Sequence, residues 1–183
     1  MSFLLDGLHE DLNRSHRTPH PTAPPLRSQD TAAPLTDEQT ARVAWKAHKR
    51  RNNSVIVDMF QGQFRSRTTC TSCGYVSSSF TPFANLSLPL PKRRGSLSLH
   101  DCLKLFVVSE TISGWKCPKC QCARTARKCM DVWQLPPVLV VHLKRFSFDG
   151  PVRDKLRNLV RFPSDLDPHL ICGKSQRYER YQL

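Results

Sequence analysis

The chain has 183 residues, 39% of them hydrophobic, which is enough for one domain or for part of a larger one. No apolar run approaches the roughly 20 residues of a membrane-spanning helix, and the N-terminus lacks the apolar stretch of a secretory signal, so we expect neither membrane insertion nor export. The formal net charge of +13 is scattered in short clusters typical of a solvated surface. We expect the chain in the reducing cytoplasm or nucleus, so its eight cysteines are not expected to form a disulfide framework.

The first predicted element is an amphipathic helix over residues 3–13, because Leu5, Leu8 and Leu12 recur at helical spacing. The apolar stripe of this helix needs a cover, either from later segments of the chain or from a partner. A loop is predicted next, over residues 15–35, because the prolines that crowd there disfavour both helix and sheet.

Two paired strands are predicted after a second helix. Thr36 followed by Gln39 is typical of a capping box, which predicts a helix that ends near His48. The sequence then becomes rich in β-branched and aromatic residues, and residues 63–69 and 75–80 are predicted to be short strands joined by a tight turn.

A second capping-box pattern, Ser98 with Asp101, predicts a short helix with one buried face. Its apolar residues recur at helical spacing and are Leu99, Cys102, Leu103 and Phe106. We expect Cys102 to be a buried small hydrophobic residue. Further on, residues 138–143 are apolar on both alternating faces except at His142, a pattern that predicts a central strand buried on both sides, and another strand is predicted to end at residues 161–163.

The strongest chemical signal is a pair of Cys-x-x-Cys turns, formed by Cys70 with Cys73 and by Cys117 with Cys120. Each turn can point two thiolates at one place, and two turns supply the four sulfurs of a tetrahedral zinc site. Because protein ligands would fill all four positions, the zinc is expected to be structural. Cys122 could replace Cys120 as a ligand, and two unrelated cysteine pairs or a redox-active dithiol are the alternatives.

Six segments of the chain form an ordered series. They are residues 3–13 (FLLDGLHEDLN), 60–63 (FQGQ), 70–73 (CTSC), 86–91 (LSLPLP), 117–120 (CPKC) and 135–146 (LPPVLVVHLKRF). In this order they resemble the ubiquitin-specific protease family. Any one segment would be a weak signal, but together they extend over nearly the whole chain.

The resemblance implies an α+β fold, the papain-like cysteine protease hand, incomplete here, with an antiparallel zinc-ribbon sheet as its fingers. It implies that residues 1–14 are the end of the thumb, 15–35 a proline-rich loop, 36–134 the fingers and 135–183 part of the palm. In that family the fingers grip ubiquitin, so the implied partners are ubiquitin or ubiquitinated proteins. The implied reaction is the cysteine-type hydrolysis of ubiquitin isopeptide bonds.

The family's cysteine box, Gly-Asn-Thr-Cys, and its histidine box, Gly-His-Tyr, do not occur in this sequence. Cys129 and Cys172 show no local sign of activation, so no residue is assigned a catalytic role and we expect the chain to be inactive alone. One alternative is a non-catalytic zinc module that binds ubiquitin or another protein. A less favoured one is a basic zinc-ribbon nucleic-acid binder, because the basic clusters are not interleaved with the aromatic residues that single-strand binders use.

Overall fold

The computed structural model describes residues 2–15, 35–92, 95–147, 154–172 and 181–182, so the predicted loop at 15–35 lies outside the described residues except at its two ends. The helices are α1 (Ser2–Leu12), α2 (Asp37–Arg51), α3 (Val55–Phe60), α4 (Leu99–Phe106) and the 3₁₀ helix η1 (Pro168–Leu170). The strands are β1 (Gly62–Cys70), β2 (Val76–Phe83), β3 (Leu86–Pro89), β4 (Leu97–Ser98), β5 (Glu110–Lys116), β6 (Ala123–Gln134), β7 (Val141–Lys144), β8 (Phe146–Ser147), β9 (Asp154–Lys155), β10 (Val160–Arg161), β11 (Asp165–Leu166) and β12 (Tyr181–Gln182). None of the helices in this part of the chain has the length and apolar character to cross a bilayer.

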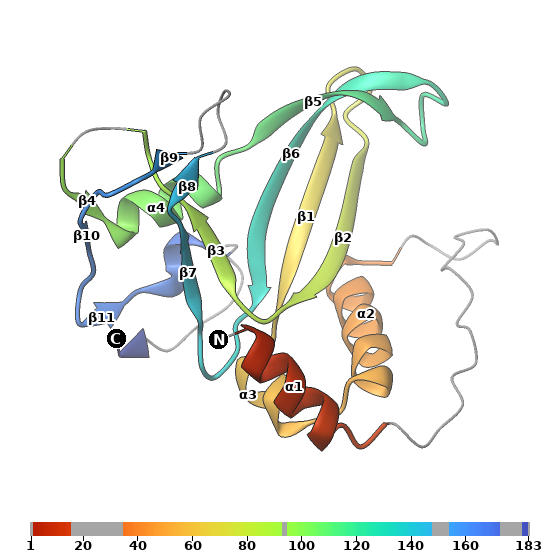
Figure 1. Ribbon diagram of the computed structural model, residues 1–183. Helices are drawn as coiled ribbons and strands as arrows, with labels where there is room; N and C mark the ends of the chain where they lie inside the picture. The colour runs from red at the N-terminus through yellow and green to blue at the C-terminus, as the bar shows by residue number, and fades with distance from the viewer. Residues whose placement is uncertain (1, 16–34, 93–94, 148–153, 173–180, 183) are drawn as a thin grey trace.

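The fold is α+β, as predicted, and its largest part is an antiparallel sheet of four strands in the order β2–β1–β6–β5. In Figure 1 these strands rise from the level of α2 and α3 to a tip where the β1–β2 and β5–β6 turns lie. The predicted strands at 63–69 and 75–80 are confirmed as an antiparallel pair, although the second begins at Val76 and continues to Phe83.

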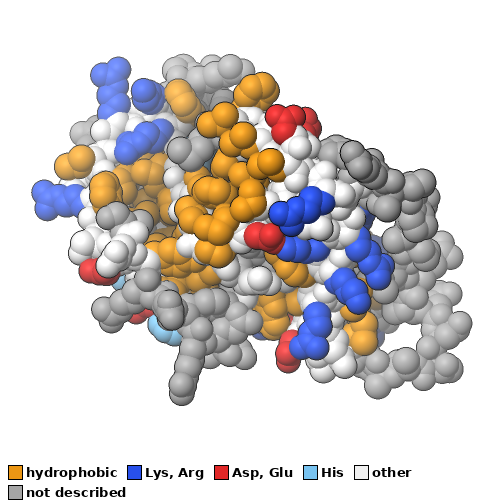
Figure 2. All heavy atoms as spheres, turned by 90° about the horizontal axis from the view of Figure 1, so that it is seen from below, with side chains coloured by type: hydrophobic (Ala, Val, Ile, Leu, Met, Phe, Trp, Pro, Cys, Tyr) orange, Lys and Arg blue, Asp and Glu red, His pale blue; other side chains and the backbone are white. Residues whose placement is uncertain are grey.

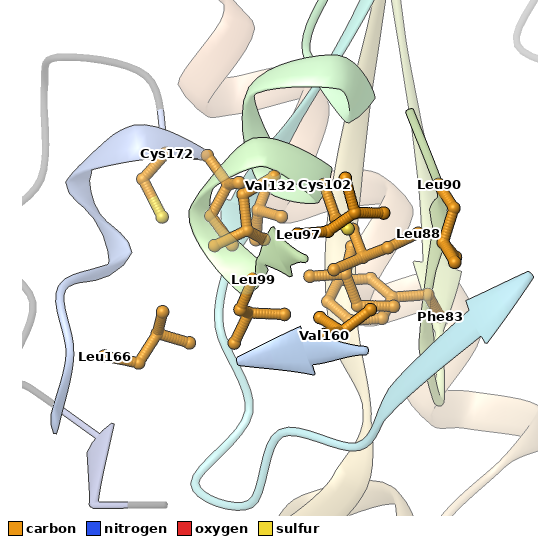
Figure 3. Packing of buried hydrophobic residues seen from close by; sticks show 13 residues of the cluster. Phe83, Leu88, Leu90, Leu97, Leu99, Cys102, Val132, Val160, Leu166 and Cys172 are labelled. Carbon is orange, nitrogen blue, oxygen red and sulfur yellow. The ribbon is translucent and has the colours of Figure 1, made fainter. Parts of the chain in front are cut away.

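The main hydrophobic core lies beside this sheet, where α4 packs on β3 and β4. Figure 3 shows side chains from α4, β3, β4, β6 and β10 turned toward one another. Cys102 and Leu103 are fully buried, which confirms the predicted apolar face of α4. The helix starts where predicted, because the backbone N–H of Asp101 donates to Ser98 Oγ (3.1 Å) and that of Ser98 donates to Asp101 Oδ2 (2.9 Å).

Helix α2 also starts as predicted, with both hydrogen bonds of the capping box between Thr36 and Gln39 present. It continues beyond His48 to Arg51, and its last turn is basic. Cations in the last turn are favoured by the partial negative charge at a helix C-terminus, which is a physical reason for the longer helix.

An ionic network attaches α2 to the sheet. Arg65, whose side chain is 11% exposed, donates through Nε and Nη2 to the carboxylate of Asp131 at 3.0 and 2.5 Å, and through Nη1 to Asp37 at 3.3 Å. Its guanidinium also lies 5.1 Å from the ring centroid of Trp133. The hydrogen-bonded carboxylate of Asp131 is the main cause that raises the pKa of Arg65. The network therefore holds β1, β6 and the first turn of α2 in one arrangement.

We expect Asp131→Asn to lower the free energy of unfolding by about 2 kcal/mol. This is less than the ~3–5 kcal/mol for breaking a fully buried pair, because Asp37 remains as a partner for Arg65. Urea denaturation measures the change. The control is Glu38→Gln, which breaks the Arg42–Glu38 pair. The side chains of this pair are 77% and 74% exposed, so the variant should lower the free energy of unfolding by less than about 0.5 kcal/mol. Equal losses in the two variants would contradict the assigned role of Asp131.

The prediction of a strand over residues 138–143 buried on both sides is wrong. The strand is β7, and among the described residues it pairs only with β3, in parallel. Its residues alternate between half-buried and exposed, His142 is exposed, and Val138 is 39% exposed. Two prolines precede Val138, and its backbone N–H donates to the Met59 carbonyl (2.9 Å) rather than to a strand, so the apolar run begins as a connection.

Helix α3 was not predicted from the sequence. Val55, Ile56 and Val57 favour a strand by their β-branched side chains, but Ser54 Oγ accepts a hydrogen bond from the Val57 backbone N–H (3.3 Å) and caps a helix instead. By contrast, β10 ends at Arg161, just before Phe162 and Pro163, as the sequence predicted.

Candidate functional site: a four-cysteine centre

The two Cys-x-x-Cys turns lie at the same end of the sheet. Cys70 ends β1, and the second pair lies in the turn between β5 and β6. Because β1 and β6 are antiparallel neighbours with Cys70 opposite Ala126, the turn after β1 and the turn before β6 must lie side by side. The backbone N–H of Thr71 also donates to the Thr125 carbonyl at 3.1 Å, which ties the two turns together.

Both turns have the same backbone geometry. The N–H of Gly74 donates to the Cys70 carbonyl (3.0 Å), and the N–H of Gln121 donates to the Cys117 carbonyl (2.9 Å). Gly74 has φ 68° and Gln121 has φ 58°, so the residue after each second cysteine is left-handed. Glycine adopts this conformation without strain, as expected for Gly74, whereas Gln121 does so only because the turn requires it.

The four sulfur atoms form the cluster that the sequence predicted. The Sγ atoms of Cys70, Cys73, Cys117 and Cys120 all lie within 4.8 Å of one another, and those of Cys73 and Cys117 are 3.6 Å apart. A tetrahedron with metal–sulfur bonds of about 2.3 Å has edges of roughly 3.8 Å, so these positions fit one metal ion. Cys122 is exposed and lies outside the cluster, which does not support it as an alternative ligand.

Two thiols of the cluster, Cys70 and Cys120, have pKa values shifted in opposite directions. Backbone N–H groups, first that of Cys73 and then that of Ser72, lower the pKa of Cys70 to about 6 against the effect of burial. The pKa of Cys120 is raised to about 12, chiefly by its hydrogen bond with Cys73 and then by burial. Four sulfurs this close cannot all be negative without a compensating charge. A divalent cation would supply that charge, since thiols that bind a metal are deprotonated.

In the part of the chain that the structure describes, the other cysteines and histidines do not form such a cluster. Cys102 and Cys172 are buried and Cys129 is half-buried. The hydrogen bonds of His9, His48 and His142 go to hydroxyl and amide side chains. The absence of a catalytic residue from this chain stays a prediction.

A hollow of about 470 Å³ lies between the sheet, α4 and β3. Apolar side chains line it together with two lysines, Glu110, Asn85 and Ser87, and Lys128 pairs with Glu110 at 3.7 Å. Its apolar lining includes Phe64, Leu105, Phe106 and Met130, and its two lysines are Lys128 and Lys144. Leu105, at the end of α4, is 37% exposed, so an apolar surface is accessible at this hollow.

Comparison with known proteins gives a consistent result. The family model described as Ubiquitin carboxyl-terminal hydrolase matches residues 1–183. Ubiquitin carboxyl-terminal hydrolase 2 of Gallus gallus is 37% identical over 188 residues, which cover 100% of this chain and 51% of that protein. The protein of the same name from Rattus norvegicus is 38% identical, covering 100% of this chain and 29% of that protein. The chain thus spans about half, or less, of the length of these relatives.

Solved structures share the fold. The SAGA DUB module bound to monoubiquitin matches with a TM-score of 0.64 and 25% identity, covering 79% of this chain and 33% of that chain. The module of Ubp8, Sgf11, Sus1 and Sgf73 bound to ubiquitin aldehyde matches with a TM-score of 0.61 and 23% identity, covering 75% of this chain and 31% of that chain.

Proposed function

Because this chain belongs to the ubiquitin carboxyl-terminal hydrolase family, we propose that it is the zinc-bearing central part of a ubiquitin-specific protease domain. In this role it holds ubiquitin, while other segments supply the nucleophile and base that hydrolyse the isopeptide bond. The observation that carries the proposal is the four-cysteine cluster at the tip of an antiparallel sheet.

The proposed ion is zinc. Four thiolates in a tetrahedral arrangement are typical of zinc or iron–sulfur sites, and two Cys-x-x-Cys turns on separate hairpins are typical of a structural zinc ribbon. Cys70, Cys73, Cys117 and Cys120 would hold it, and when bound it would supply folding energy and no chemistry of its own. We place the chain in the cytoplasm or nucleus, where its cysteines, all free in this structure, would stay reduced.

The proposed docking face for ubiquitin is the hollow between the sheet and α4. Phe64, Leu105, Phe106 and Met130 provide an apolar centre, and Lys128 and Lys144 provide charge at its side. An apolar centre with a polar rim is the composition of many protein interfaces. Two solved structures of similar fold contain ubiquitin or ubiquitin aldehyde, which supports the choice of partner.

Hydrolysis needs groups that this chain is not expected to supply. A thiolate nucleophile must lie within hydrogen-bond reach of a histidine base, and a third group must orient that base. The hydrogen bonds of His9, His48 and His142 are made to side chains that cannot act as nucleophilic thiols. The part played by this chain in the proposal is therefore to hold the partner.

We expect zinc-loaded chain to bind labelled ubiquitin saturably and to leave ubiquitin–rhodamine uncut. Leu105→Asp should weaken binding about tenfold or more, because it places a charge in the apolar centre of the interface. Val43→Asp is the matched control, since Val43 is similarly exposed (41%) but lies on α2. Measurable cleavage would overturn the absence of catalytic groups. Equal binding by both variants would overturn the docking face.

A further inference from the structure

A continuous chain of hydrogen bonds joins α1, α2 and α3 through two histidines. Ser54 Oγ lies 2.7 Å from His9 Nδ1, and His9 Nε2 lies 3.2 Å from Asn52 Oδ1. Asn52 Nδ2 lies 3.2 Å from His48 Nδ1, and His48 Nε2 lies 2.7 Å from Gln61 Oε1. The sequence offered little sign of this chain, since its members come from three separate helices and their ends.

The partners determine which nitrogen of each ring carries a proton. An amide oxygen only accepts, so His9 Nε2–H donates to Asn52 Oδ1 and His48 Nε2–H donates to Gln61 Oε1. An amide nitrogen only donates, so His48 Nδ1 is bare and accepts from Asn52 Nδ2, which also donates to the His48 carbonyl at 3.2 Å. Ser54 Oγ accepts from the Val57 N–H and also lies in hydrogen-bond range of His9 Nδ1. His48 is therefore neutral, with its proton on Nε2.

A proton added to His48 Nδ1 would face the Asn52 NH₂ group, a donor against a donor. If the Asn52 amide turned over to accept that proton, it would lose its bond to the His48 carbonyl. Its NH₂ group would then face the Nε2–H of His9. The neutral form of His48 is thus favoured by the whole chain of hydrogen bonds.

The charges around His48 act in the same direction. Burial is the main cause that lowers the pKa of His48, the Gln61 hydrogen bond opposes it, and His9, Arg51 and Lys49 lower it further. From α3, Asp58 is engaged in an ion pair with Lys49. The acidic residues of α1, all exposed, are Asp6, Glu10 and Asp11.

Few apolar contacts compete with these polar ones in holding α1. The helix packs on α3, but much of its apolar stripe is open to solvent. Figure 2, seen from the side on which α1 and α3 lie, shows hydrophobic side chains gathered on this face. The exposed apolar residues of α1 are Phe3 (92%), Leu4 (63%), Leu8 (41%) and Leu12 (47%). The described residues therefore do not cover the apolar stripe of α1, which the sequence analysis expected to be covered.

We propose that His9, Asn52 and His48 form a pH-sensitive latch, which holds α1 against α2 and α3 at neutral pH and loosens it in mildly acidic solution. A second contact does not titrate. Asn13, one helical turn after His9, donates to the Arg51 carbonyl (3.0 Å) and accepts from the Asn53 N–H (3.0 Å). The end of α1 at Asn13 therefore stays attached when the latch opens, and the helix pivots there.

The direction of the pH effect follows from the lowered pKa of His48. The unfolded or released form takes up a proton first, at about pH 6.5. The stabilisation is therefore complete above that pH, and it declines as the pH falls from there toward the pKa of the latched form.

The first test is ¹⁵N-histidine NMR on the full chain. We expect His48 to show the Nε2–H tautomer at neutral pH and to titrate below the ~6.5 of a free histidine. A His48 that is protonated at neutral pH, or that carries its proton on Nδ1, would overturn the latch. This measurement needs no variant and therefore does not depend on a variant folding.

The second test is amide hydrogen exchange of α1, corrected for intrinsic rates, at about pH 7.5 and about pH 5.5, on either side of the free histidine pKa. Protection of α1 should be lower at about pH 5.5 than at about pH 7.5, because protonation of His48 favours the released helix. In His48→Gln, which stays neutral, the fall should vanish. In Asn13→Ala, protection of α1 should be lower than in the wild type by the same factor at both pH values. The decrease from about pH 7.5 to about pH 5.5 should remain. The proposal would be overturned if protection of α1 in the wild type were the same at both pH values. It would also be overturned if the decrease at low pH persisted in His48→Gln.

Discussion

Cys117→Ser is expected to abolish zinc binding and to unfold the tip of the sheet. Cys117 is fully buried and contributes one of the four sulfurs of the cluster. Structural zinc sites contribute roughly 10–16 kcal/mol of apparent binding free energy in small zinc-finger peptides, so the loss of one ligand should lower the melting temperature strongly. Elemental analysis gives the zinc content per chain, and circular dichroism gives the melting temperature.

Cys122→Ser is the matched control for this prediction. Cys122 lies two residues after Cys120 but is exposed and outside the cluster. The variant should keep one zinc ion per chain and the wild-type melting temperature. A purified wild-type chain without zinc, or a Cys122→Ser variant that loses as much zinc as Cys117→Ser, would contradict the assignment of the site. Removal of zinc from wild-type chain by a chelator should reproduce the Cys117→Ser phenotype.

Gly62→Ala is expected to destabilise the fold by about 3 kcal/mol, at the upper end of the usual cost of overpacking. A Cβ at this position would lie 2.4 Å from the Gln134 carbonyl oxygen and 2.7 Å from two ring carbons of Phe83. Gly62 starts β1, directly opposite Phe83 of β2, and neither the neighbouring backbone nor the buried ring can move away easily. The free energy of unfolding in urea measures the effect.

Gly7→Ala serves as the control because both variants add the same methyl group. Nothing lies within 4 Å of a Cβ at Gly7, and alanine favours a helix over glycine by about 1 kcal/mol. The control should therefore be neutral or stabilising. Similar losses in both variants would show that the close approach at Gly62 is not what requires glycine there.

The structure gives a physical reason for the Phe-Gln-Gly-Gln segment at residues 60–63. Gln61 accepts the last hydrogen bond of the chain that passes through His9 and His48. Gly62 leaves room for the backbone of β6. The buried Gln63 donates through Nε2 to the Ala41 carbonyl at 3.1 Å. The segment thus joins α1, α2 and the sheet. From the sequence it could be recognised as part of a family pattern, but its contacts could not be derived.

Local patterns in the sequence determined the features that depend on residues close together in the chain. The capping boxes at Thr36 and Ser98 are confirmed, because each consists of hydrogen bonds across one helical turn. The two Cys-x-x-Cys turns form because the backbone hydrogen bond that closes each of them joins residues four positions apart. Local patterns were misleading at 138–143, where an apolar run predicted a strand buried on both sides, whereas β7 begins only at Val141 and alternates between half-buried and exposed residues.

The tertiary structure alone decided the features that join distant residues. The pairing of β1 with β6 brings Cys70 beside Cys117, and the path of the chain brings His9 to Ser54 and Gly62 to Gln134. Residue spacing contains no information on these distances, because each is determined by how the intervening segments pack. The sequence by itself therefore determined which residues could bind a metal and where α2 and α4 begin. Only the packed chain determined that four sulfurs lie together and that His9 and His48 belong to one chain of hydrogen bonds beside the first helix.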